Sequence, residues 1–341
     1  MQRLASLDTI RGIAVMAIVF WDFFALLSKD LDWYAFTIIG SFPLYGVPPV
    51  LFFFAAGASQ CLSISSRKAR GQQNWEIRNH VLNRSCVLLL AGILLTMILR
   101  EPPDNWGLFE GIALASMVGY FLLTYMNQRL LAVLLTTLIG LSSIIPPNFS
   151  IQMPSVEFLG GPYLVMPNLL QRALFSGLFP FFPFFCFFLS GAILGKSLVE
   201  KRNISRCVVS CGSAISGLGL FLHLIGYPME YHQIGNVYSL ACVVFSIGAS
   251  TLILGLFYWL QDVKAFRLHI LKPLTDCGRA SFAICFWRYP LIYNPLIYVG
   301  LAFIFPVGMA AILSMSLLFP TWLFAVGWTT MRKRASLQIC G

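Results

Sequence analysis

Long apolar segments follow one another along almost the whole chain, from residue 10 to residue 329. Many are about 20 residues long, which is the length of α-helix that crosses the hydrocarbon core of a bilayer. Only 11% of the residues are charged, whereas soluble domains carry about 25%. In lipid every backbone polar group must be bonded within the protein, and helices meet this requirement. The sequence therefore predicts an all-α, polytopic transmembrane helical bundle, an integral multi-pass protein of the cytoplasmic membrane or of an internal membrane.

About ten apolar segments are long enough to be spans. No internal repeat or low-complexity linker separates them, so we predict a single transmembrane domain over residues 1–341. The longest connection, 146–168, is rich in proline and glycine and is expected to be irregular. The predicted spans are residues 10–27, 44–65, 81–99, 107–126, 129–146, 169–195, 207–226, 237–261, 281–301 and 306–329.

Basic residues gather in alternate connections between these spans, whereas the opposite connections carry mainly acidic residues. The positive-inside rule places the basic connections in the cytoplasm, together with both termini. The formal net charge of +10 therefore indicates membrane orientation, and we expect a lipid bilayer as a partner and no nucleic acid. The basic connections are those that hold Arg67 to Arg84, Lys196 to Arg206, Lys264 to Arg279, and Arg332 to Arg334.

Charged residues also lie within or beside the spans, where an ionised side chain is unfavourable unless it is paired or reaches water. Asp8 and Arg11 open the first span, where they either anchor the helix end at the interface or serve a function. Asp22 lies eleven residues beyond Arg11, about three helical turns further, so the two share a face of the helix. Asp22 is therefore expected deep in the membrane, toward the outer leaflet.

Other intramembrane ions are expected in the outer half of the bundle. Arg288 lies inside the ninth span, while Glu110 and Arg172 lie at the outer ends of the fourth and sixth spans. With Asp22 they balance in charge, and we assign Asp8, Arg172 and Arg288 to an intramembrane charge network. For Asp22 and Arg288 we favour a water-filled functional cavity over a structural ion pair. For Glu110 and Arg172, near the interface, we favour a structural role.

Cysteine and histidine residues give no pattern typical of a metal site. No Cys-x-x-Cys pair occurs, and the four histidines are far apart in sequence, so we predict no metal. The cysteines are interpreted as small buried residues of the spans rather than as disulfide partners. These are Cys61, Cys86, Cys186, Cys207, Cys211, Cys242 and Cys285.

Several short motifs together resemble one known family. The chain opens with an Arg-x-x-Ser-Leu-Asp-x-x-Arg-Gly-Ile-Ala motif at residues 3–14. The order and spacing of this motif and of five further motifs are similar to those of the heparan-alpha-glucosaminide N-acetyltransferase catalytic-domain family, part of the transmembrane acyltransferase superfamily. The resemblance covers most of the chain. The other motifs lie at residues 51–59, 83–85, 109–114, 179–195 and 277–282.

This resemblance implies a membrane-embedded enzyme that takes an acyl group from cytosolic acyl-CoA. The donor would be acetyl-CoA or another acyl-CoA, and the acceptor an extracytoplasmic amine or hydroxyl. Arg11, Arg84 and Arg279 would bind the CoA phosphates, for which guanidinium groups are chemically suited. The basic residues near Arg84 are explained equally well by the positive-inside rule.

The chain departs from the family's pattern at its histidines. Some members carry a histidine in the first outer loop, and related acyltransferases place one eleven residues after the arginine. Many relatives also have a histidine in the penultimate region. This chain has acidic residues at 30 and 32, Asp22, and Arg288 at those places, and no histidine before residue 80. A general base would then be a carboxylate, and the candidates are Asp22, Asp32 and Glu110. The protein is either active with a carboxylate base or catalytically degenerate.

Two rival functions stay open on the sequence alone. A non-catalytic subunit of a membrane complex would pack against integral membrane partner proteins through its aromatic surface, since 15% of the residues are aromatic. A transporter would also combine proline-broken spans with central charges. The transporter hypothesis is weakened because no inverted repeat is visible in the sequence.

Overall fold

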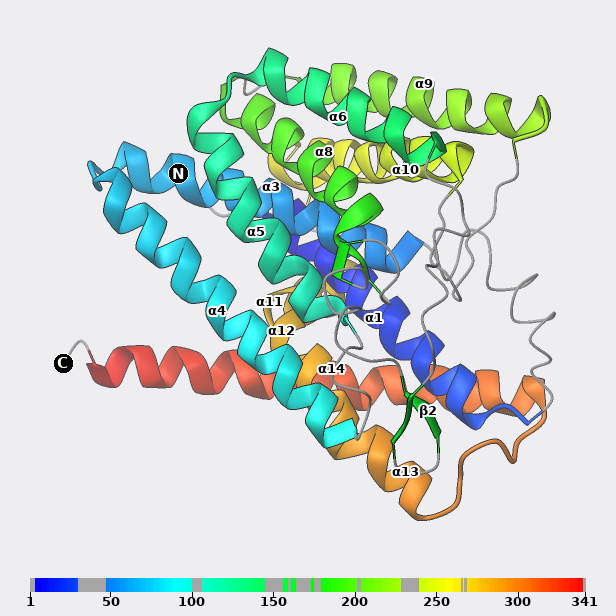
Figure 1. The fold of residues 1–341 in the computed structure, drawn as a ribbon. Helices are drawn as coiled ribbons and strands as arrows, with labels where there is room; N and C mark the ends of the chain where they lie inside the picture. The colour runs from blue at the N-terminus through cyan, green and yellow to red at the C-terminus, as the bar shows by residue number, and fades with distance from the viewer. Residues whose placement is uncertain are drawn as a thin grey trace. The chain divides into compact units, whose positions relative to one another are not determined.

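Eight helices in the described part of the chain are long and apolar enough to cross a membrane (Figure 1). The computed structural model describes residues 4–29, 47–99, 106–144, 156–158, 161–163, 173–174, 179–200, 204–227, 239–264, 266 and 269–339. The eight helices are α1 (Ala5–Leu27), α3 (Val47–Ala69), α4 (Asn74–Leu99), α5 (Leu108–Tyr125), α8 (Phe181–Glu200), α9 (Ser205–Leu224), α10 (Leu240–Phe257) with its π-helical extension η2 (Tyr258–Val263), and α14 (Val307–Ile339). The prediction of an all-α multi-pass membrane protein is confirmed.

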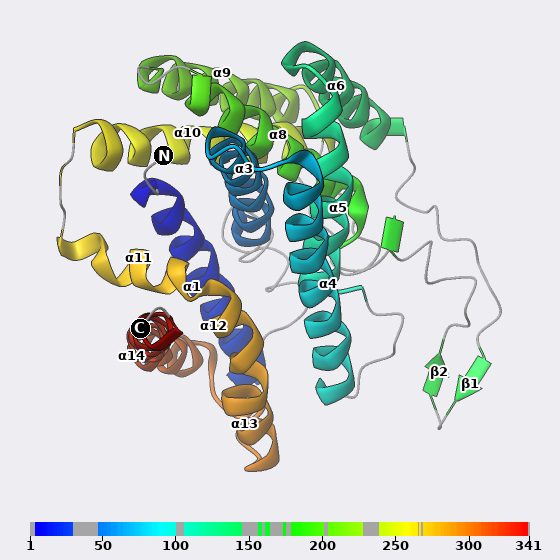
Figure 2. The ribbon, with the colours of Figure 1, turned by 90° about the vertical axis from the view of Figure 1, so that its left-hand side faces the viewer.

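Two predicted spans take a different form. The span at 129–146 is α6 (Gln128–Ile144), whose apolar part is shorter than those of the eight. The span at 281–301 is divided into α12 (Ser281–Arg288), the π-helical turn η4 (Tyr289–Tyr293) and α13 (Asn294–Tyr298), which continue in one line in Figure 2. Pro290 lacks an N–H, so the regular hydrogen-bond ladder of α12 cannot continue through it. The helix changes its type at this point.

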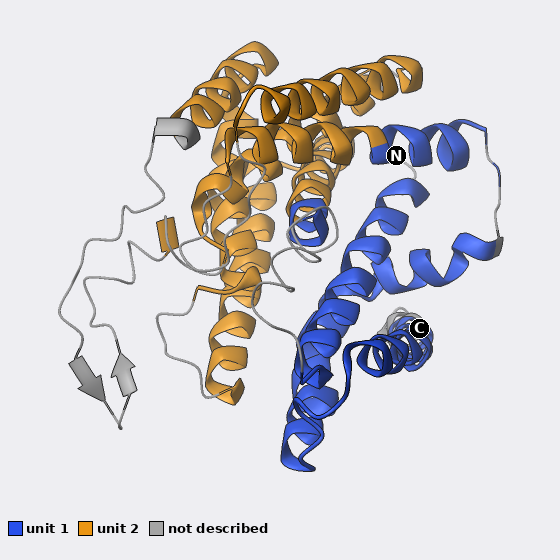
Figure 3. Ribbon diagram, turned by 90° about the vertical axis from the view of Figure 1, so that its right-hand side faces the viewer, with its two compact units in different colours: residues 1–52, 253–341 blue, residues 53–252 orange. Residues whose placement is uncertain are grey.

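The chain forms two compact units, which are described separately (Figure 3). The first unit contains residues 1–52 and 253–341, and the second contains residues 53–252. The first unit thus joins the two ends of the sequence around α1. The predicted single domain over residues 1–341 stays a prediction.

In the first unit, α1 packs against α11 (Lys272–Arg279), α12 and α14. Aromatic residues Trp21 and Phe24 pack with Leu27 and with Ala310 of α14 near the end of α1. The segment before α14 also joins α1, because the N–H groups of Phe303 and Phe305 donate to the carbonyls of Leu26 and Leu27, at 2.8 and 3.0 Å. These bonds satisfy carbonyl groups that a helix leaves without partners at its end.

In the second unit, α5 packs against α4 and α8, and α6 packs against α8. Gly57 of α3 and Gly191 of α8 lie at a close helix contact, since a side chain on either would overlap the backbone of the opposite helix. Across a second contact, Gln60 Nε2 of α3 donates to the carbonyl of Ser116 of α5 at 2.8 Å. Small residues and polar bonds of this kind hold helices together in lipid, where the hydrophobic effect between helices is absent.

Two local features differ from expectation. Part of the connection 146–168, expected to be irregular, forms a short antiparallel hairpin of β1 (Val156–Phe158) and β2 (Gly161–Tyr163). Among the cysteines expected to be buried, Cys86, Cys207 and Cys211 are instead exposed on α4 and α9. The outer face of a membrane helix is as apolar as its inner face, so apolar composition alone does not identify the buried side.

Candidate functional site

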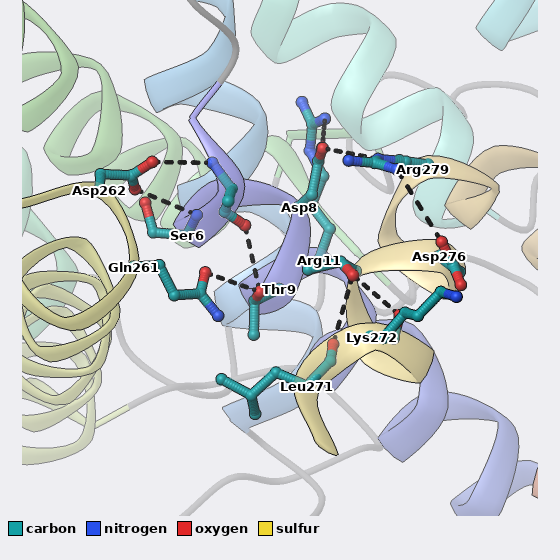
Figure 4. A network of polar contacts seen from close by, with 12 residues as sticks. Ser6, Asp8, Thr9, Arg11, Gln261, Asp262, Leu271, Lys272, Asp276 and Arg279 are labelled. Atoms are coloured by element: carbon teal, nitrogen blue, oxygen red, sulfur yellow. Dashed lines mark hydrogen bonds and ion pairs between the residues drawn. The ribbon is translucent and has the colours of Figure 1, made fainter. Parts of the chain in front are cut away.

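A cluster of charged residues surrounds the beginning of α1 in the first unit (Figure 4). The carboxylate of Asp8 is 2% exposed and lies between two guanidinium groups. Its oxygens are 3.8 Å from Arg11 Nη1 and 3.4 Å from Arg279 Nε. Arg279 also lies 3.9 Å from Asp276, one turn earlier on α11. Asp8 therefore links the first segment of the chain to a helix that follows it by more than 260 residues.

Two glycines allow this approach. A Cβ atom at Gly278 would overlap the backbone oxygen of Asp8, and one at Gly12 would overlap that of Leu274. Helices α1 and α11 thus meet backbone to backbone, and Arg279, next to Gly278, is brought to Asp8. The same contact buries Cys277, and this burial raises the pKa of the Cys277 thiol to about 12.

The end of α10 supplies a cap for α1. The carboxylate of Asp262 accepts hydrogen bonds from the backbone N–H groups of Ala5 and Ser6, at 3.0 and 3.2 Å. Gln261 belongs to the same π-helical extension η2 as Asp262, and its Oε1 accepts a hydrogen bond from Thr9 Oγ1 at 3.0 Å. The residue before the helix, Leu4, gives no side-chain cap. An acidic group from a distant segment therefore neutralises the positive end of the α1 dipole.

A second cluster lies further along α1 and contains Asp22, Arg288 and Tyr289. Arg288 Nη2 is 2.8 Å from Asp22 Oδ2 and donates to the Tyr289 hydroxyl oxygen at 2.9 Å. The Tyr289 hydroxyl in turn donates to Asp22 Oδ2 at 3.3 Å. The guanidinium also lies over the Tyr289 ring, 4.5 Å from its centre. The side chain of Arg288 is 9% exposed and that of Asp22 is 22% exposed, so the ion pair is largely enclosed.

Four other predicted site residues do not belong to these two clusters in the part of the chain that the structure describes. They are Asp32, Arg172, Glu110 and Arg84. Asp32 and Arg172 lie outside the described residues. Glu110 is buried in the first turn of α5 in the second unit, against Gly92 of α4, where an added Cβ would overlap the carboxylate. Arg84, also in the second unit, is exposed on α4 and makes no hydrogen bond or ion pair with the residues that the structure describes.

Sequence reasoning missed three polar residues of the first unit. Tyr289 follows Arg288 directly, but nothing in the sequence alone indicates a role for its hydroxyl. Asp262 and Asp276 lie in a basic connection, where the excess of positive charge indicates only orientation. The spacing of Asp276 and Arg279, three residues apart on a helix, is a signal that could have identified a pair.

The fold and these clusters define a class, that of multi-pass membrane proteins with ionised residues paired between their helices. The particular family follows from comparison with known proteins. The model of the family described as "Heparan-alpha-glucosaminide N-acetyltransferase, catalytic" matches residues 3–228, and the chain belongs to this family. The match includes Asp8, Arg11 and Asp22 of α1, while Arg279 and Arg288 follow it. No curated protein matches the chain.

Proposed function

We propose that this acetyltransferase-like membrane protein moves an acyl group from cytosolic acyl-CoA to an amine or hydroxyl acceptor on the other side of the membrane. Membership in the family supports the class of reaction. The observation that carries the proposal is the second cluster, in which Asp22 lies on an apolar helix within hydrogen-bond reach of both Arg288 and Tyr289. Ionised groups at such places are unfavourable and are by default candidates for function.

In this proposal Asp22 is the general base. The side chain of Asp22 is 22% exposed, whereas Glu110 is 5% exposed and packed against Gly92. An acceptor can therefore approach Asp22 more easily than Glu110, which suits a structural role. Asp32 remains a predicted alternative base. The Tyr289 hydroxyl, which donates to Asp22 at 3.3 Å, holds the carboxylate in place.

The three arginines predicted to bind CoA differ in what they offer. Arg279 is 42% exposed and Arg11 is 19% exposed, and Asp8 orients both. Arg84 is exposed on α4. A phosphate binds a guanidinium through two parallel hydrogen bonds, and the exposure of Arg279 and of Arg84, each within its own unit, supports the proposed role of each in binding acetyl-CoA or another acyl-CoA.

Purified protein in detergent tests the proposal through acetyl-CoA binding, acyl-CoA turnover and yield. Asp22→Asn keeps the size of the side chain but removes a base, so turnover per amount of folded protein should fall about 10²-fold. Arg84→Gln and Arg279→Gln should weaken acetyl-CoA binding, and Arg332→Gln, an exposed arginine near the end of α14, is the matched control. A parent protein that neither binds acetyl-CoA nor turns it over would contradict the proposal.

A second candidate function is that of a non-catalytic subunit of a membrane complex. The direct 2.8 Å ion pair of Asp22 and Arg288 favours it, because a carboxylate that serves only to hold two helices together does not act as a base. If the ion pair has only a structural role, the Asp22 variants should give a different result from the one expected for a catalytic base. Asp22→Asn would then leave an uncompensated buried guanidinium, which costs about 3–5 kcal/mol, and yield would fall. The double variant Asp22→Asn with Arg288→Gln would regain yield. Isolation from native membranes as a stable larger assembly would support this candidate.

A further inference from the structure

Arg288 offers hydrogen-bond donors that the described part of the protein does not use. Its Nη2 serves both Asp22 and Tyr289, but its Nε and Nη1 are buried and have no hydrogen-bond partner among the described residues. The side chain is more than nine-tenths buried. A guanidinium carries five N–H donors, and leaving buried donors unpaired is unfavourable. Each of these two N–H groups is therefore a donor for an oxygen that a bound molecule supplies.

The guanidinium is also held in a fixed position. It is bonded to Asp22 on one side and lies 4.5 Å from the centre of the Tyr289 ring. Arg288 is the last residue of α12, and the π-helical turn η4 follows it directly. Single π-helical turns inside helices are frequent at functional sites. A fixed donor of this kind binds a developing negative charge without first having to reorganise.

We propose that Arg288 binds the carbonyl oxygen of the acyl group during its transfer. This inference rests on the proposed function. The acceptor's N–H or O–H proton passes to Asp22 as its nitrogen or oxygen bonds to the thioester carbon. The carbonyl electron pair moves to oxygen, and the resulting oxyanion accepts a hydrogen bond from one of the unpaired N–H groups of Arg288. The carbonyl then re-forms, the C–S bond breaks, and the CoA thiolate takes the proton from Asp22, which gives the acylated acceptor and free CoA.

Comparison of acetyl-CoA with free CoA tests this role, because free CoA lacks the carbonyl. The parent protein should bind acetyl-CoA about 10-fold more tightly than CoA, as expected for one hydrogen bond to a charged group. Arg288→Lys keeps the positive charge beside Asp22 but loses the Nε and Nη1 donors. It should abolish this preference, leave the affinity for CoA unchanged, and lower turnover about 10²-fold. Arg332→Lys is the matched control and should keep the preference.

If Arg288→Lys does not fold, the double variant Asp22→Asn with Arg288→Gln replaces it, since it removes both buried charges together. It should bind both compounds equally. An infrared spectrum of the parent with carbonyl-labelled acetyl-CoA should show the thioester C=O band shifted to lower frequency by the hydrogen bond. An unshifted band, or a variant that keeps the preference for acetyl-CoA, would overturn the role of Arg288 while leaving the acyltransferase proposal intact. A parent that binds neither compound refutes both.

Discussion

Asp22 Oδ2 and Arg288 Nη2 lie 2.8 Å apart, although 266 positions separate the two residues in the chain. Asp8 and Arg279 form a similar pair nearer the start of α1. The residues Asp8 and Asp22 are about 21 Å apart along α1 at 1.5 Å per residue. One helix near the N-terminus therefore holds the segment 272–293 at two points by ion pairs. The same segment contains Arg279, which we propose binds CoA, and Arg288, which we propose binds the acyl carbonyl oxygen.

The close contact of α1 and α11 predicts that Gly278→Ala is destabilising. The added methyl group would overlap the backbone oxygen of Asp8, so the helices must move apart, at a free energy of about 1–3 kcal/mol or more. Thermal unfolding in detergent measures the effect. Gly327→Ala on α14 is the matched control, because its Cβ would meet nothing within 4 Å. Equal melting temperatures for the two variants would contradict the backbone contact.

The pairing of Asp8 predicts an asymmetry between its two sides. Asp8→Asn removes the carboxylate shared by both ion pairs and leaves arginines that are 19% and 42% exposed, so the expected loss is about 1–2 kcal/mol. Arg279→Gln removes a partner that is 42% exposed, and the expected loss is below about 1 kcal/mol. Unfolding temperatures of the two variants under the same conditions measure the difference. A larger loss for Arg279→Gln than for Asp8→Asn would show that Asp8 is not the centre of this cluster.

The cap on α1 predicts that Asp262→Ala loosens the beginning of the helix. The backbone N–H groups of Ala5 and Ser6 would lose their acceptor, which costs about 1 kcal/mol. Hydrogen exchange of these two amides should become faster, while the amides in the middle of α1 should keep their protection. Asp262→Asn retains an amide oxygen and should give an intermediate result. Unchanged exchange at Ala5 and Ser6 in Asp262→Ala would refute the cap.

The buried thiol of Cys277 predicts a specific pH dependence. Burial raises its pKa from 9.0 to about 12, and only the thiolate reacts with maleimides. The folded protein should therefore resist labelling at Cys277 at about pH 9, where the unfolded chain is readily labelled. Because the unfolded state loses this proton first, the thiol's contribution to stability should fall as the pH rises from about 9 to about 12. Peptide mass spectrometry measures the labelling, and rapid modification of the folded protein at Cys277 would contradict its burial.

The distribution of basic residues predicts the orientation in the membrane. Both termini should be cytoplasmic, and the connection 146–168 should face the opposite side. In intact cells, tags at either terminus should resist external protease, and Glu157→Cys should react with an impermeant thiol reagent. The parent protein, which lacks a cysteine at this position, is the control for background labelling. Labelling of residue 157 only after the cytoplasmic side is opened would reverse the proposed topology.

The sequence by itself determined the class of the protein and the position of most of its helices. Eight of the predicted spans correspond to long apolar helices, because an apolar segment of sufficient length has few alternatives in a bilayer. The motif at residues 3–14 also led to the family that the comparison confirms. Asp22 and Arg288 are conspicuous in the sequence itself, since an ionised residue in an apolar segment is unfavourable without a partner.

Only the tertiary structure decided which residues meet. Arg11 and Asp22 share a face of α1, yet Arg11 pairs with Asp8, and Asp22 pairs with Arg288. Charge and periodicity rank residues along one helix, but a partner depends on how closely two helices approach. At Gly12 and Gly278 that approach is set by backbone contacts, which no single-helix pattern contains. Likewise, only the tertiary structure shows that Nε and Nη1 of Arg288 have no hydrogen-bond partner among the described residues.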